Sequence, residues 1–217
     1  MPLYGILNLA LYEFKRIFNK NGRTVTGVVE RMNLDAIRKN INELDDEMKR
    51  LFDARLSCSG QVASVKMEER DEVFKPQREK EIAKRFSGEG DTWYLPYIKK
   101  VIQLSRKYQY RQFLDAGQVD EGFDAWLDDA GKGNRSAMSD GGELALAVRT
   151  DPLEERGLSA NDVLSVVSDT RLKITGITYN ALKNEVNMSL WIEDTEQQKQ
   201  EAYLLAYMLY KESVNVN

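Results

Sequence analysis

The segment NLDAIRKNINELDDEMKRLFDAR, residues 33–55, decides the fold expected for the first half of the chain. Its apolar side chains recur at alternating steps of three and four residues, which places them on one face of an α-helix. Asn33 suits the N-cap position, and the pattern stops at Arg55. Because so short a seam is marginal as a free coiled coil, we predict an antiparallel helical hairpin or bundle. The seam consists of Leu34, Ile37, Ile41, Leu44, Met48 and Leu51.

A second apolar face is expected nearer the N-terminus, on a helix over residues 3–18. Such a face most often packs into the chain's own core. It also suits a partner subunit, or the surface of a membrane with the following basic residues at the headgroups. The two faces together are the candidate protein-interface residues of this chain. The second face consists of Leu3, Leu7, Leu11, Phe14 and Phe18.

The residues after the seam predict further helices separated by turns. We interpret Ser57–Gly60 as a break. Pro76 suits the first turn of a helix that runs to Phe86. Pro96 starts another helix, and Gly117 is its expected cap.

The C-terminal part alternates helix and strand signals. Ser159 with Asp162 resembles a capping box at the start of a helix, and Thr195 begins the last helix. Residues 172–177 are rich in β-formers, and residues 186–192 alternate strictly between apolar and other side chains. We therefore predict an α+β, mostly helical protein: an N-terminal helical bundle, then a small α-β-β-α unit with an antiparallel hairpin.

Charge and composition divide the chain near its middle. Residues 1–118 carry 22 basic and 17 acidic side chains, whereas residues 119–217 carry 9 and 18. Residues 131–142 are rich in turn formers. We predict a helical bundle over 1–130, a Gly-rich linker or loop over 131–142, and an acidic subdomain over 143–217. Opposite charge on the two halves favours attraction between copies.

Several function classes are excluded by residues that the sequence lacks. The chain has no histidine and one cysteine, Cys58. Histidine-dependent catalysis and imidazole-based zinc sites are therefore ruled out. We expect no cofactor, no metal and no catalytic residue, and no small-molecule substrate is evident. No apolar run is long enough to span a membrane, and no basic segment precedes an apolar start. We expect a cytoplasmic or virion protein that is not secreted through a signal peptide.

Two clusters indicate alternative functions. A basic and aromatic stretch on the helix after Pro96 suits a nucleic-acid-binding accessory protein, because cations neutralise phosphates and rings stack on bases. Asp120, Asp124 and Asp128 would share one helix face, which suits a carboxylate-based, metal-dependent enzyme. The basic and aromatic candidates are Lys99, Lys100, Arg106, Lys107, Tyr110 and Arg111.

The leading hypothesis from the sequence is a non-enzymatic structural or assembly protein within a homo- or hetero-oligomer, such as a virion or secretion-complex component. It depends on the two apolar faces, the charge division and the missing histidine. The predicted α-β-β-α unit resembles in outline the small ring-forming modules of secretion and virion assemblies. This resemblance covers about residues 158–212 and depends on the order of elements.

Overall fold

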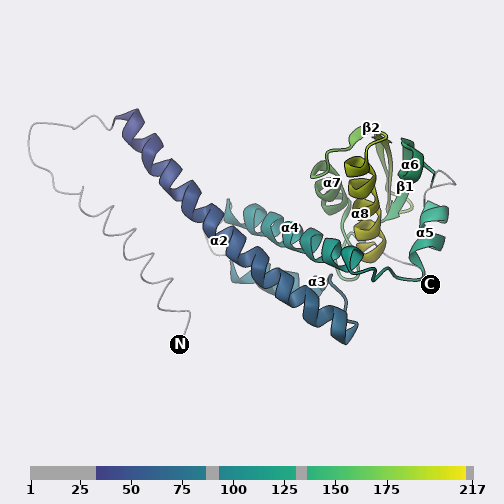
Figure 1. Cartoon of the computed structure of the whole chain (residues 1–217), viewed down its shortest axis with the longest axis horizontal. Coiled ribbons are helices and arrows are strands. Elements are labelled where there is room, and N and C mark those ends of the chain that lie inside the picture. Colours follow the sequence, from purple (N-terminus) through teal and green to yellow (C-terminus); the bar gives the residue numbers. More distant parts are fainter. Residues whose placement is uncertain (1–32, 87–92, 131–135, 214–217) are drawn as a thin grey trace, which may run out of the picture. The chain divides into compact units, whose positions relative to one another are not determined.

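The computed structural model describes residues 33–86, 93–130 and 136–213, and the chain divides into two compact units, Met1–Glu47 and Met48–Asn217. Within the described residues there are seven helices and one three-stranded antiparallel sheet (Figure 1). The prediction of an α+β, mostly helical protein is confirmed. The predicted helix over residues 3–18 lies outside the described residues.

Helix α2 spans Leu34–Glu69 and begins where the sequence predicts. The side-chain oxygen of Asn33 accepts a hydrogen bond from the backbone N–H of Asp35 at 3.1 Å. This bond satisfies one of the donors that a helix leaves unpaired at its start.

The predicted break at Ser57–Gly60 is wrong, because α2 continues through it. The hydroxyl of Ser59 donates to the backbone carbonyl of Arg55 at 3.0 Å, so it bonds within the helix. A Cβ atom on Gly60 would lie 3.2 Å from the side chain of Gln112. Small residues here permit close helix packing, and they do not mark a turn.

Helices α3, Pro76–Arg85, and α4, Tyr94–Asp115, follow. Pro76 stands at the start of α3 as predicted, whereas α4 begins two residues before Pro96. Gly117 follows α4 with a φ of 70°, which glycine adopts without strain.

The next elements are α5, Phe123–Ala130, α6, Ala137–Asp140, and β1, Gly142–Arg149. Strand β1 was not anticipated from the sequence, and α6 lies within the segment predicted as a linker or loop. Residues 131–135 lie outside the described residues. The division of the chain at residues 131–142 stays a prediction.

The remaining elements follow the predicted order: α7, Ala160–Ser168, β2, Lys173–Asn180, β3, Glu185–Ile192, and α8, Glu196–Glu212. Ser159 and Asp162 form the predicted capping box. The sheet order is β1-β3-β2, with both pairs antiparallel. Every second side chain of β3 from Val186 to Ile192 is therefore buried.

We call residues 142–213 the sheet module. The main core joins this module to α4 and α5. Tyr110 of α4 is buried and packs edge-on against Tyr207 of α8, with ring centroids 5.9 Å apart. Val73, which precedes α3, belongs to the same core. Helix α4 is therefore anchored on α8, and this contact positions the site described next.

Candidate functional site

One face of α2 carries two cations separated by small, buried residues. Arg55 and Lys66 are eleven residues apart, which is three helical turns and about 16 Å along the axis. Ser59 and Ala63 lie between them on the same side and are buried. We call these four residues the Arg55–Lys66 face.

Both cations are partly withdrawn from solvent without a carboxylate in direct contact. Arg55 donates to the backbone carbonyl of Val101 at 3.3 Å and to the hydroxyl of Ser105. The Lys66 ammonium donates to the carbonyls of Glu72, at 2.7 Å, and Val73, at 3.0 Å. Burial lowers the pKa of each cation, and nearby acids oppose that effect only in part. Among the described residues neither forms an ion pair, so an anion bound here would meet two uncompensated positive charges.

Glu79, in the first turn of α3, is an acid whose charge reaches both cations of this face. Its charge raises the pKa of Arg55 and of Lys66, although in each case other groups contribute more. Both of its carboxylate oxygens accept hydrogen bonds from Nη1 of Arg106, at 2.6 and 2.5 Å. Glu79 thus acts on the α2 cations through its charge and directly contacts a third cation, Arg106 of α4.

Helix α4 supplies neutral polar groups beside these charges. Ser105 contacts Arg55, and Gln109 follows one turn later on the same face. The Oε1 atom of Gln109 is buried and has no hydrogen-bond partner among the described residues. A buried acceptor left unpaired costs about 1–3 kcal/mol, so a ligand that donates a hydrogen bond here would gain from it.

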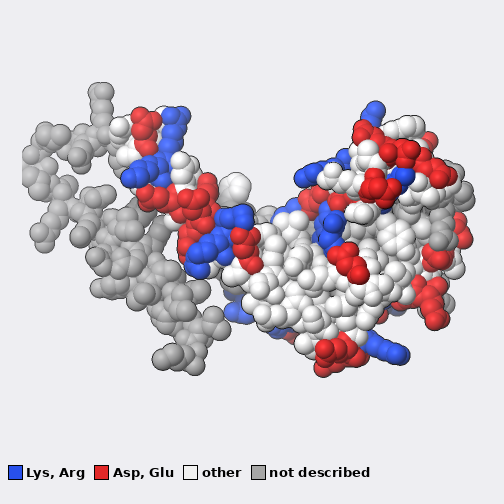
Figure 2. Space-filling model, viewed as in Figure 1, with Lys and Arg blue, Asp and Glu red and all other residues white. Residues whose placement is uncertain are grey.

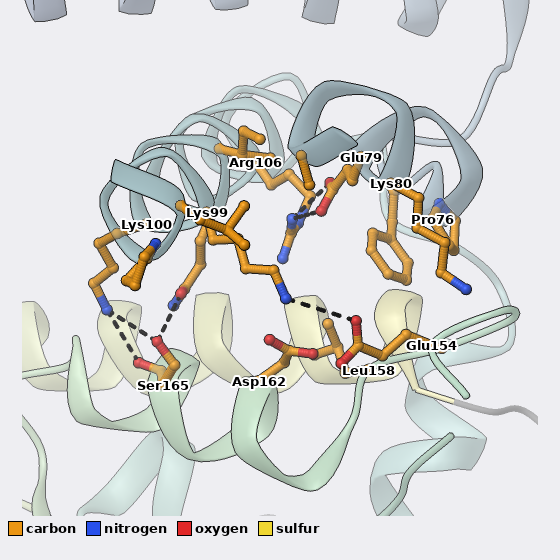
Figure 3. A pocket seen from close by; sticks show the side chains of 17 residues that line it. Pro76, Glu79, Lys80, Lys99, Lys100, Arg106, Glu154, Leu158, Asp162 and Ser165 are labelled. Carbon is orange, nitrogen blue, oxygen red and sulfur yellow. Dashed lines mark hydrogen bonds and ion pairs between the residues drawn. The ribbon is translucent and has the colours of Figure 1, made fainter. Parts of the chain in front are cut away.

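A cleft of about 450 Å³ is lined by Glu79 and Arg106 but not by Arg55 or Lys66 (Figure 3). It separates α3 and α4 from α7 and the loop before it. Of its three lysines, Lys99 lies 3.8 Å from Glu154, and Lys100 contacts Ser165 at 3.2 Å and also Asp169. Lys80 donates to the backbone carbonyl of Leu153 at 2.9 Å. Two of the three lysines of the cleft thus pair with carboxylates, whereas neither cation of the Arg55–Lys66 face does so among the described residues.

The residues proposed for nucleic-acid binding do not form a single exposed basic face. Arg106 and Tyr110 are buried, and burial raises the pKa of the Tyr110 hydroxyl. Lys107 and Arg111 both pair with Glu201 of α8. These side chains attach α4 to the sheet module, which their sequence spacing alone did not indicate.

The other predicted residues are also placed by the structure. The seam residues on α2 are largely exposed, and the five N-terminal candidates lie outside the described residues. Asp120 precedes α5 and contacts Lys211 at 3.0 Å. The described part of the chain contains no cluster of acidic, histidine or cysteine side chains suited to a metal ion, and none of its helices is long and apolar enough to cross a membrane.

Sequence reasoning missed Arg55 and Lys66 as site residues. The signal was present, since both side chains share a helix face if α2 continues past Arg55. The interpretation of Ser57–Gly60 as a break concealed that face. Glu79 and Gln109 had no local signal that would bring them to it.

Comparison with known proteins shows that the site residues lie in a segment that matches a family model. The family model described as chorismate mutase type II matches residues 37–110, about a third of the chain. This segment includes the α2 cations, α3 and most of α4. No curated protein and no solved structure matches the chain.

The match corrects the hypothesis of a non-enzymatic structural or virion component. The matched family is an enzyme family that converts chorismate to prephenate, so it points to catalysis on a small molecule. The expectation of a non-enzymatic role, which depended in part on the missing histidine, was wrong for a physical reason. Histidine matters to reactions that move protons or bind metals, and an enzyme can also work by orienting and electrostatically stabilising a reacting molecule.

Proposed function

We propose that this protein catalyses the rearrangement of chorismate to prephenate at the Arg55–Lys66 face. The observation that carries this proposal is the pair of partly buried cations, without carboxylate partners among the described residues, inside the segment that matches the chorismate mutase type II model. We place the reaction in the cytoplasm, in keeping with the expectation from the sequence.

The chemistry of this rearrangement suits the side chains present. One C–O bond breaks and one C–C bond forms within the same molecule, and no proton, electron or group is exchanged with the protein. Catalysis then requires binding the substrate in its folded conformation and stabilising the negative charge that develops on the ether oxygen. A site without histidine, metal or cofactor can meet both requirements.

The two carboxylates and the hydroxyl of chorismate have counterparts on or beside this face. The substrate carries two carboxylates, and Arg55 and Lys66 are the cations that would bind them. It also carries a hydroxyl group, for which the carboxylate of Glu79 and Oε1 of Gln109 are the available acceptors. The cations would be restored toward their ordinary pKa by the bound carboxylates.

The full-length protein is expected to convert chorismate to prephenate. The measurement is the loss of the ultraviolet absorbance of chorismate with time, with prephenate identified by its acid-catalysed conversion to phenylpyruvate. The control is Lys49→Met, which removes an exposed α2 cation paired with Asp53. A rate no higher than the uncatalysed rearrangement at saturating chorismate would overturn the proposal.

We further propose that a second copy of the chain covers the seam on α2. Charged side chains of both signs are interspersed along α2 in the face shown in Figure 2, as on a solvated helix surface. Apolar seam residues are nevertheless about half exposed, and a continuous apolar stripe on a helix normally packs against another element. The exposed seam residues are Leu34, Ile41, Leu44, Met48 and Leu51.

Leu44→Glu is expected to reduce the native mass to that of a monomer, because it places a charge in the centre of this seam. Asn42→Glu adds the same charge to the same helix at an exposed position away from the seam and is the matched control. Native mass spectrometry at low and high salt measures both. A wild-type monomer at high concentration, or equal effects of the two variants, would contradict self-association through the seam.

A further inference from the structure

A buried charge network connects the sheet module to Glu79. Arg106 and Glu212 have side chains that are 7% and 0% exposed. Nε of Arg106 donates to Oε1 of Glu212 at 2.8 Å, and Nη2 donates to Oε2 at 3.1 Å. The remaining nitrogen, Nη1, holds Glu79. One planar guanidinium therefore bridges two carboxylates from different parts of the chain, as Figure 3 shows for Glu79.

Glu212, which belongs to the sheet module, holds this guanidinium in its orientation. Glu212 ends α8, whose preceding residues Met208 and Leu209 are buried in the main core. The backbone carbonyl of Glu212 also accepts a hydrogen bond from Leu158 at 3.0 Å. Arg106 lies over the ring of Phe74, with 4.9 Å between its guanidinium carbon and the ring centroid. The cation is thus held on both its edge and its face.

Helix α3 has modest packing, in which its Ile82 side chain is partly buried against the cluster of Ile98, Val101 and Ile102. It is ten residues long, and none of its residues is buried. A helix of this length is not stable by itself. The contact of Arg106 Nη1 with both carboxylate oxygens of Glu79 is therefore the restraint that acts directly on the Glu79 side chain.

We propose that Glu212 is a positioning residue for the rearrangement site: through Arg106 it holds the carboxylate of Glu79 beside the Arg55–Lys66 face. This inference depends on the proposed function. It makes the sheet module, which lies outside the segment matched by the family model, a required part of the catalytic unit.

The test compares two glutamates of the same helix. Glu212→Gln removes the charge that orients Arg106 and keeps the shape of the side chain. Glu201→Gln is the matched control, because Glu201 also joins α8 to α4, through Lys107, and is mostly buried. We expect Glu212→Gln to lower kcat/KM for chorismate by about 10- to 100-fold, the effect of a small misplacement in a site. We expect Glu201→Gln to stay within about twofold of the wild type, because it does not contact Glu79.

A double-mutant cycle separates positioning from loss of structure. If Glu212 acts through Glu79, the variant Glu79→Gln/Glu212→Gln is no slower than Glu79→Gln alone. The proposal would be overturned if the losses in kcat/KM of the two single variants multiply in the double variant. It would also be overturned if Glu212→Gln keeps the wild-type kcat/KM. If Glu212→Gln does not fold, Arg106→Lys replaces it in the same cycle, since one ammonium cannot bridge both carboxylates as the guanidinium does.

Hydrogen exchange gives a readout that does not require activity. In Glu212→Gln the amides of α3 are expected to lose protection, while in Glu201→Gln they keep it. Unchanged protection of α3 would overturn the positioning role. An inactive wild type with this protection pattern would instead remove the proposed reaction and leave the structural link from Glu212 to α3 intact.

Discussion

Arg55→Met is expected to lower kcat/KM for chorismate by about 100- to 1,000-fold, the usual cost of removing one preorganised charged or hydrogen-bonding group from a site. Methionine retains the apolar length of the arginine side chain but has no charge. Ser105 still donates its hydroxyl hydrogen to the carbonyl of Val101 at 2.8 Å, so the local packing has no new unpaired donor. Lys66→Met is expected to have an effect of the same order, because it removes the second cation.

Steady-state rates with chorismate measure these effects, and circular dichroism checks that each variant is folded. Arg55→Lys should retain more activity than Arg55→Met, because it keeps the charge and loses only the forked geometry. Rates for Arg55→Met within threefold of the wild type would show that the Arg55–Lys66 face does not bind the reacting dianion.

Arg106→Met is expected to lower the free energy of unfolding by about 3–5 kcal/mol, the range for removing one partner of a buried ion pair. Burial alone would lower the pKa of Arg106, but the carboxylates of Glu212 and Glu79 outweigh it and raise that pKa. Without the guanidinium, Glu212 is left fully buried without its partner. Urea-induced unfolding followed by circular dichroism measures the loss. Lys107→Met, at a more exposed pair, should cost clearly less.

The loss in Arg106→Met should depend on pH in a defined direction. Burial raises the pKa of the Glu212 carboxyl, and Arg106 opposes this shift in the wild type. In the variant the folded protein therefore binds a proton at Glu212 more readily than the unfolded chain does. Its stability relative to the wild type should increase as the pH falls from about 7 toward 5. A loss below about 1 kcal/mol, or one that grows on acidification, would contradict a buried ionised network.

Local signals in the sequence were sufficient for much of the secondary structure. Asn33 starts α2, Pro76 starts α3, and Ser159 with Asp162 caps α7, because each feature depends on residues within one helical turn. The alternation in β3 was recognisable for the same reason. These determinants are short-range and do not require knowledge of any partner element.

Strand β1 and the site required the tertiary structure. Residues Gly142–Arg149 become a strand by pairing with Glu185–Ile192. Arg55 meets Ser105 across 50 residues of sequence, and Arg106 meets Glu212 across 106. A charged side chain has no local preference that identifies so distant a partner, and packing of α4 between α2 and α8 decides these contacts. The sequence by itself determined where most of the described helices begin and which side chains of β3 face inward. Only the packed chain determined which of the described cations pair with carboxylates, and it placed Arg55 and Lys66, which do not, on one partly buried face.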